Sequence, residues 1–211
     1  MNSSALPECR SPLIEWGISS FVPPEETECG DMHLIKGVER GVLAAMVDGV
    51  GHGRVAAAAA RLAVSTLEAH AGKGIVTLFR LCHQSLQGTR GAVINLVSFD
   101  GEQNEMMWLG VGNVAGVLLR TGGRKAGRPC EGLSPRGGVV GYKLPPLQAS
   151  VLPVEPGDTV VLATDGINPN FEADVDTEIS PREMAARLCA KHANRRDDGM
   201  VLVVRYLGWN K

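Results

Sequence analysis

Four aspartate-bearing segments of this 211-residue chain lie beside short apolar runs, at places where strands are expected to begin or end. Asp31 comes just before MHLIK, Asp48 follows LAAMV, Asp165 follows VVLAT, and the pair Asp197 and Asp198 precedes MVLVVRYL. A single aspartate in such a place is usually a turn former or a helix cap. Four segments of this kind can converge if their strands lie side by side, so the set predicts one acidic pocket at neighbouring strand ends.

Such a pocket has a definite chemistry. Carboxylates within roughly 4–6 Å of one another repel and raise one another's pKa, and bound cations keep them ionised. Ligation by oxygen alone selects hard ions, Mg²⁺ or Mn²⁺. Two such ions roughly 3.5–4 Å apart can bridge a water molecule, lower its pKa and hold a phosphoryl group for in-line attack. The pattern therefore predicts two divalent cations and phosphoryl chemistry.

The segment VDGVGHG (47–53) places Asp48 among three glycines. Gly49, Gly51 and Gly53 are expected to let the backbone turn tightly and to bring a main-chain carbonyl close to an ion. The stretch GHGRVA (51–56) also fits the loose G-x-G-x-x-A pattern of dinucleotide-binding domains. Against that alternative, Asp48 would repel a pyrophosphate, and the next segment is predicted to be a second helix rather than a strand.

Apolar periodicity and turn residues predict the elements that position these aspartates. The expected strands cover residues 13–22, 32–37, 41–47, 92–99, 104–112, 115–120, 147–154, 159–166 and 199–207, and the expected helices cover 54–71, 73–87 and 180–193. Ser180 is the predicted N-cap of the last helix, with Pro181 at its first position. The glycine-rich segment 121–141 is expected to be mobile and to face the substrate. The fold class predicted is α+β, with antiparallel sheets covered by helices.

Size and composition set the protein class. A chain of 211 residues and 22.3 kDa is expected to form one domain, and its net charge of −2, without any basic tract, argues against nucleic acid and anionic membranes as partners. No apolar run approaches the roughly 20 residues of a membrane span, and no signal peptide is expected. The five cysteines are widely spaced with no C-x-x-C, which favours reduced thiols and a cytoplasmic location.

Six segments together resemble the PPM (protein phosphatase 2C-like) serine/threonine phosphatases, in particular the bacterial branch that contains SpoIIE and the stressosome phosphatase RsbX. In chain order they are CGD (29–31), VDGVGHG (47–53), GTRGAV (88–93), LGVGNVAGVLL (109–119), LPVEPGDTVVLATDGI (152–167) and RDDGMVLVV (196–204). They span about residues 12–207. GTRGAV, GVGNV and the lack of a sensor domain favour the RsbX type, so a single catalytic domain is expected over residues 1–211.

The resemblance implies a fold and an activity. The fold is a four-layer α-β-β-α sandwich, in which two antiparallel sheets lie face to face with helices outside and metals at one end. The activity is metal-dependent hydrolysis of phosphoserine or phosphothreonine in proteins, with a metal-bridging hydroxide as nucleophile and no covalent phosphoenzyme. By the same resemblance, the substrate is a phosphorylated STAS-domain protein of a stressosome or anti-sigma-factor module. A catalytically silent family member that acts as a binding module is the alternative, and the full aspartate set weighs against it.

The resemblance also implies roles for single residues. Asp48 matches the ligand that bridges both ions, and the Gly49 carbonyl matches a further ligand. Asp165 and Asp197 match ligands of one ion, and Asp31 matches the aspartate at the second. Asp198 falls where many relatives have asparagine or a second aspartate, so it ranks below Asp197. Asp48 and Asp165 are thus the predicted catalytic pair.

The chain departs from the family pattern at two positions. The general-acid histidine of the eukaryotic relatives falls at Val50, and His52 lies two places later with no role that can be carried over. The usual threonine after the last aspartate pair is Met200. Arg90, in the glycine-flanked GTRGAV loop, is a candidate ligand for the substrate phosphate. Without a matching histidine, metal-bound water is expected to protonate the leaving serine oxygen.

Overall fold

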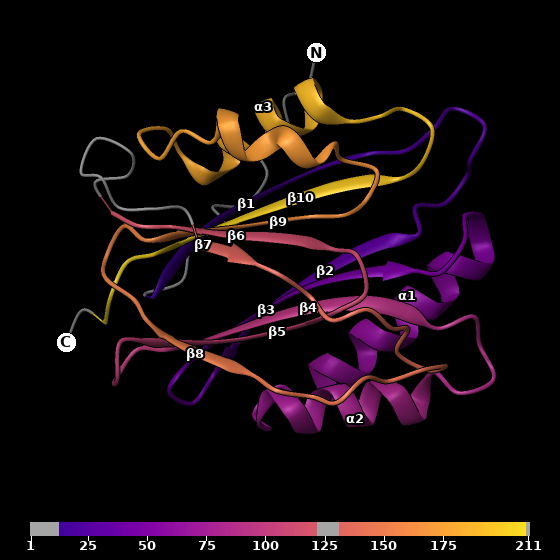
Figure 1. Cartoon of the computed structure of the whole chain (residues 1–211), viewed down its shortest axis with the longest axis horizontal. Coiled ribbons are helices and arrows are strands. Elements are labelled where there is room, and N and C mark those ends of the chain that lie inside the picture. The colour runs from indigo at the N-terminus through magenta and orange to yellow at the C-terminus, as the bar shows by residue number, and fades with distance from the viewer. Residues whose placement is uncertain (1–12, 122–130, 210–211) are drawn as a thin grey trace, which may run out of the picture.

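The computed structural model describes residues 13–121 and 131–209. Two antiparallel sheets lie face to face with helices on their outer faces (Figure 1). The first sheet has the order β1 (Ile14–Phe21), β10 (Gly199–Tyr206), β9 (Thr159–Ala163), β6 (Ala115–Leu119) and β7 (Glu131–Leu133). The second has the order β2 (Asp31–Val38), β3 (Gly41–Gly49), β4 (Ala92–Asp100), β5 (Glu105–Val111) and β8 (Ser150–Pro153). The predicted α+β fold class and four-layer sandwich are confirmed.

The second sheet is covered by two helices, α1 (Gly53–Ala69) and α2 (Ile75–Ser85). β3 is buried along nearly its whole length because it lies between two strands, with the helices over one face and the first sheet over the other. Small side chains of α1, including Ala56, Ala60 and Ala63, are fully buried against this sheet. Because these side chains are small, the helix axis can lie close to the strands, so the alanine-rich sequence allows tight packing of α1 on the second sheet.

The first sheet is covered by α3 (Pro181–His192). The Ser180 side chain accepts a hydrogen bond from the Glu183 amide at 3.2 Å, and Pro181 occupies the first turn. The predicted start of this helix is therefore confirmed. Between the sheets, apolar side chains such as Met46, Phe99 and Leu202 form the central core.

Two expectations about the chain after β6 need correction. The segment 121–141 was expected to be mobile, yet residues 131–133 form β7, because hydrogen bonds to the edge of β6 hold them; residues 122–130 lie outside the described part. The strand expected over 147–154 is limited to Ser150–Pro153, where it pairs with β5. A short 3₁₀ helix, η2 (Pro169–Asp174), was not predicted.

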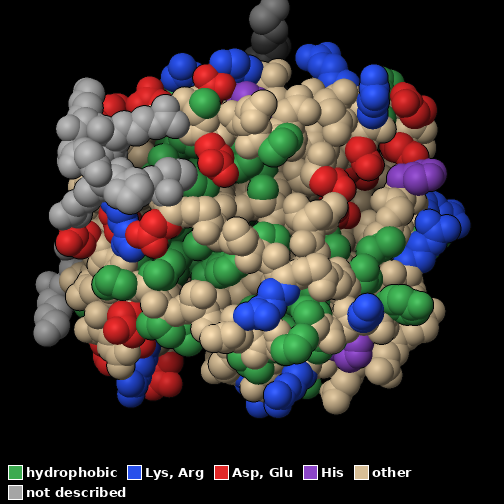
Figure 2. Space-filling view, in the orientation of Figure 1, with side chains coloured by type: hydrophobic (Ala, Val, Ile, Leu, Met, Phe, Trp, Pro, Cys, Tyr) green, Lys and Arg blue, Asp and Glu red, His purple; other side chains and the backbone are tan. Residues whose placement is uncertain are grey.

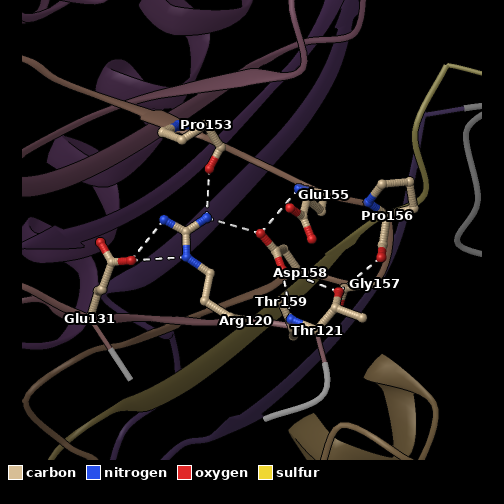
Figure 3. Close-up of polar contacts among 9 residues, drawn as sticks. All are labelled: Arg120, Thr121, Glu131, Pro153, Glu155, Pro156, Gly157, Asp158 and Thr159. Atoms are coloured by element: carbon tan, nitrogen blue, oxygen red, sulfur yellow. Dashed lines mark hydrogen bonds and ion pairs between the residues drawn. The ribbon is translucent and has the colours of Figure 1, made fainter. Parts of the chain in front are cut away.

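A polar network joins the two sheets at the end that lies away from the aspartates (Figure 3). Arg120, just after β6, donates from Nε and Nη2 to Oε1 of Glu131, at 2.9 and 2.7 Å. Its Nη1 donates to Oδ2 of Asp158 at 3.0 Å and to the Pro153 carbonyl of β8. Because Pro153 belongs to the second sheet and the other three residues border strands of the first, this network fixes the sheets relative to each other.

Two expectations about protein class can be compared with the described residues. None of the helices there has the length and apolar character needed to cross a membrane. Cys29, Cys82 and Cys189 are free thiols, in line with the predicted reduced state, while Cys9 and Cys130 lie outside the described part. Burial raises the pKa of the Cys29 thiol to about 12, so this cysteine beside the acidic pocket is not a reactive thiolate.

Candidate active site

The ends of several strands meet at one side of the sandwich and form an acidic pocket. Asp31 begins β2, Asp48 lies near the end of β3, Asp165 follows β9, and Asp197 and Asp198 precede β10. All five side chains line a single cavity of about 520 Å³. Figure 2 shows acidic side chains grouped on this face of the molecule. The predicted convergence of the aspartates is therefore observed.

Strand register brings the first two aspartates together. Asp31 and Asp48 are direct partners in the antiparallel pair β2–β3, so their side chains point to the same face of the sheet. Asp165 and Asp198 come from the other sheet. A side chain at Gly166 would collide with the Asp198 carbonyl, so glycine at this position lets the two loops approach closely.

Thr164 connects the two halves of the pocket, and no sequence motif distinguishes it beyond its place before Asp165. Its Oγ1 donates to Oδ2 of Asp31 at 2.8 Å and accepts from the Met200 amide at 2.8 Å. Thr164 is buried. One hydroxyl thus orients a carboxylate of the second sheet from a strand end of the first.

Asn194 holds together the two loops that carry Asp165 and Asp197. Its Oδ1 accepts from the Asp197 amide at 3.2 Å and from the Arg196 amide at 2.8 Å. Its Nδ2 donates to the Asp165 carbonyl at 3.4 Å, and its own amide donates to the Gly166 carbonyl at 2.8 Å. The sequence NRRD contained the signal for this turn, because asparagine commonly accepts from amides two and three residues later.

Asn113 is a further residue of the pocket that sequence analysis did not single out. It follows β5 in the quoted segment GVGNV, and its Nδ2 donates to Oδ2 of Asp165 at 2.7 Å. Asn113 is exposed and lines the cavity. It therefore orients the Asp165 carboxylate from the solvent-exposed side of the cavity.

Asp198 has one satisfied and one unsatisfied oxygen. Its Oδ2 accepts from the Gly30 amide at 2.6 Å, which links a loop of the first sheet to the start of β2. Its Oδ1 is buried, and within the described residues it has no hydrogen-bond partner. Burial raises the pKa of Asp198, against the lowering effect of the Gly30 amide. A buried carboxylate oxygen without a partner needs an explanation, and a bound cation provides one.

The electrostatics of the pocket disfavour several ionised carboxylates without counterions. Burial, followed by the charges of Asp31 and Asp165, raises the pKa of Asp48 to about 9. The pKa of Asp31 is raised to about 7, chiefly by burial and by the charge of Asp198, although the Thr164 hydrogen bond lowers it. A bound doubly charged cation would instead favour the ionised carboxylates.

The residues present fit hard divalent cations. The donors are carboxylate oxygens from the five aspartates, which Mg²⁺ and Mn²⁺ prefer. In the described ranges, no three acidic, histidine or cysteine side chains are already arranged to hold a metal ion. The unsatisfied Asp198 oxygen and the raised pKa values supply the independent support for a cation site.

The glycines of VDGVGHG serve different purposes. Gly51 has a φ of +101°, and a side chain there would collide with Nη1 of Arg90, so the guanidinium lies over this turn at the rim of the pocket. Arg90 therefore lies next to a residue that lines the cavity, and its role as a phosphate ligand stays a prediction. Gly49 packs against Ala56 of α1 and is not among the residues that line the cavity. Ligation by the Gly49 carbonyl stays a prediction.

His52 also lines the pocket. Its Nδ1 lies 2.7 Å from Oε1 of Glu26, which fixes the orientation of the imidazole. The imidazole is 74% exposed. Glu26 was not identified from the sequence, because it lies in the acidic loop EETECGD before β2 with no motif of its own.

The dinucleotide-binding alternative is wrong for this fold. β3 and β4 are neighbours in an antiparallel pair, and two helices connect them. A dinucleotide-binding unit needs parallel strands with a crossover helix. The glycines after β3 instead form the edge of an acidic cavity.

The model of the family described as Stage II sporulation protein E (SpoIIE) matches residues 39–206. This match covers most of the chain. The chain belongs to the SpoIIE family. The chain is 25% identical over 171 residues to the phosphoserine phosphatase RsbX of Bacillus subtilis (strain 168). The alignment covers 81% of this chain and 83% of RsbX.

Solved structures agree with the SpoIIE assignment. A structure from a study of the bacterial stressosome, a modular system adapted to control secondary messenger signalling, is 32% identical, with a TM-score of 0.81 over 91% of this chain and 99% of that one. The crystal structure of RsbX in complex with magnesium has a TM-score of 0.82 at 20% identity, over 93% and 97% of the two chains. The fold is thus the PPM phosphatase fold, and the chain is a homologue of a phosphoserine phosphatase.

Proposed function

We propose that this chain is a metal-dependent protein phosphatase that hydrolyses phosphoserine or phosphothreonine in a STAS-domain stress-signalling protein. The observation that carries the proposal is the convergence of five aspartates from distant segments on one cavity. That donor set suits Mg²⁺ or Mn²⁺, and RsbX, a homologue, was crystallised with magnesium. The stressosome origin of a 32% identical structure supports the choice of substrate class.

The proposed roles follow the placement of the side chains. Asp48, between the two sheets, is the proposed ligand of two cations, with Asp31, Asp165 and Asp197 or Asp198 as the other carboxylate ligands and the Gly49 carbonyl as a further one. When bound, the cations supply a hydroxide nucleophile at neutral pH and neutralise charge on the phosphoryl oxygens. Arg90, at the rim, binds the phosphate, and Thr164 and Asn113 orient the carboxylates by hydrogen bonds.

The test is phosphate release from p-nitrophenyl phosphate and from a serine-phosphorylated STAS-domain protein, measured with added Mn²⁺ or Mg²⁺. We expect turnover of both, loss of turnover in EDTA, and loss in Asp48→Asn even at saturating Mn²⁺. Glu102→Gln is the matched control. Glu102 lies in the turn between β4 and β5, is exposed, and pairs with Arg40. Activity that survives both EDTA and Asp48→Asn would contradict the proposal.

The remaining alternative, a catalytically silent binding module, gives a different result in the same experiment. Such a module would take up Mn²⁺ in a calorimetric titration and would bind the phosphorylated STAS-domain protein without releasing phosphate. The complete aspartate set favours the enzyme. Gathering unpaired carboxylates in one buried pocket is unfavourable, and a module that only binds does not require it.

A further inference from the structure

A short turn beside the pocket presents an aromatic side chain to solvent. Val139 and Lys143 pair across the turn, with hydrogen bonds of 2.9 and 2.8 Å between their backbones. Tyr142, at its tip, donates its amide to the Val139 carbonyl at 3.1 Å. The Tyr142 side chain is 83% exposed, the highest value for a large hydrophobic residue in the described ranges. We name residues 139–143 the Tyr142 turn.

The exposure of Tyr142 is not due to a loosely held loop. Val140, two residues earlier, is fully buried and exchanges hydrogen bonds of 3.0 and 2.8 Å with Ala92 at the start of β4. The Gly141 amide donates to Nδ1 of His83 in α2 at 3.0 Å. Gly141 has a φ of +100° and packs against Leu86, so this position requires glycine. The sheet and α2 therefore hold the aromatic side chain in solvent.

The same segment forms one wall of the cavity. Gly137, Gly138 and Val139 line the pocket together with the aspartates. Tyr142 follows Val139, a residue of the cavity wall, by three positions in the chain. The rim next to Gly91 also carries Arg90, whose side chain is exposed. A phosphoserine in the pocket would place the flanking residues of its chain over this rim and the Tyr142 turn.

The chemistry of tyrosine favours a protein contact. A large apolar ring cannot stabilise charge on a phosphoryl group in an acidic, metal-dependent pocket, so its position gives no advantage with a small phosphate ester. Tyrosine is enriched at protein interfaces, where the ring supplies apolar contact area and few rotatable bonds must be ordered. The exposure of an aromatic ring on the segment that forms a wall of the pocket is accounted for if a bound protein covers the ring.

We propose that the Tyr142 turn is a docking element for the protein part of the substrate, and that the Tyr142 ring packs against an apolar side chain next to the phosphoserine. This proposal rests on the proposed function, because it assigns the flanking sequence that the phosphatase selects. It adds a specificity residue that lies outside the acidic pocket and takes no part in phosphoryl transfer.

The experiment uses two synthetic phosphoserine peptides that differ only in the residues on either side of the phosphoserine, leucine in one and glycine in the other. p-Nitrophenyl phosphate is the third substrate, because it has no flanking chain. With Mn²⁺, the wild-type protein is expected to hydrolyse the leucine peptide with a kcat/KM about tenfold higher than the glycine peptide, mainly through KM. Tyr142→Ala should abolish this preference and leave p-nitrophenyl phosphate hydrolysis unchanged.

Two control variants separate docking from structural damage. Tyr142→Phe keeps the ring and should keep the preference for leucine. Val151→Ala removes another exposed apolar side chain, 54% exposed, from β8 at a distance from the pocket, and should change nothing. Equal hydrolysis of the two peptides by the wild-type protein, or a preference that persists in Tyr142→Ala, would overturn the docking proposal. Failure of the wild-type protein on all three substrates would instead contradict the proposed function.

Discussion

Asp31 and Asp48 are direct cross-strand partners at the end of the β2–β3 pair, and both carboxylates line the same cavity. Two like charges in this position are unfavourable in an ordinary sheet. Burial and the charge of Asp31 raise the pKa of Asp48 to about 9, and burial with the charge of Asp198 raises the pKa of Asp31 to about 7. The register of a hairpin thus stores electrostatic repulsion that divalent cations would relieve.

The metal-free protein is predicted to lose stability as pH rises. Both pKa values are higher in the folded protein than the usual 3.8, so between about pH 4 and 9 the folded state binds more protons than the unfolded chain. The free energy of unfolding should therefore fall across this window, by about 1.4 kcal/mol per pH unit for each extra proton. Thermal unfolding in EDTA between pH 6 and 9 measures this slope.

Asp48→Asn is the matched variant for the pH experiment. Without the ionisable group, its melting temperature in EDTA should decline less steeply with pH and should exceed that of the wild-type protein at pH 8. Saturating Mn²⁺ should reverse the order, because only the wild-type protein gains the stabilisation of bound metal. A wild-type slope in EDTA equal to that of the variant would show that Asp48 does not hold an extra proton in the folded state.

Asn194→Ala is predicted to weaken metal binding. Asn194 touches the backbone of both aspartate loops rather than a phosphate or an ion, so it acts as a positioning residue. Loss of such outer partners typically reduces metal affinity about 10- to 100-fold. Calorimetric titration with Mn²⁺ should show a fall in this range, while the metal-free melting temperature changes by only a few degrees.

The control for Asn194 is Asn170→Ala, at an exposed asparagine in η2. It should bind Mn²⁺ like the wild-type protein. An unchanged dissociation constant for Asn194→Ala would mean that Asp197 keeps its position without the asparagine.

Arg90→Ala is predicted to raise KM for every substrate, including p-nitrophenyl phosphate. The guanidinium lies over Gly51 at the rim, and a charge-assisted hydrogen bond to a phosphate contributes about 1.5–3 kcal/mol, or roughly 10- to 100-fold in KM. Arg90→Lys should recover part of the loss. Arg40→Ala is the control, because Arg40 is exposed and pairs with Glu102 away from the pocket. An effect confined to peptides would place Arg90 in docking rather than in phosphate binding.

Several elements could be predicted because their signals are local. β3 and β4 are continuous apolar runs, and Ser180 with Pro181 marks the start of α3. β7 could not be predicted, because three residues with a glycine in the middle form a strand only when β6 offers a free edge.

In the acidic pocket, too, local features could be predicted and long-range contacts could not. Each aspartate could be placed at a strand end from its own neighbours in sequence. Their partners could not, because Thr164 and Asn113 act through hydrogen bonds to residues 133 and 52 positions away. Asn194 has a local turn signal, but its contact with the Asp165 loop spans 29 positions. Glu26 was missed for the same reason, since its contact with His52 depends on how the loop before β2 folds back over the start of α1.

The sequence by itself determined the number and order of the main elements, the donor chemistry of the site and the family resemblance. Side-chain type, turn residues and apolar periodicity act over a few residues and are written in the chain. Only the tertiary structure decided which aspartate oxygen is left unsatisfied, which residues orient the carboxylates, and that Tyr142 is exposed on the segment that forms one wall of the pocket. These features depend on strand register and on the packing of one sheet against the other, which bring together residues that no local pattern relates.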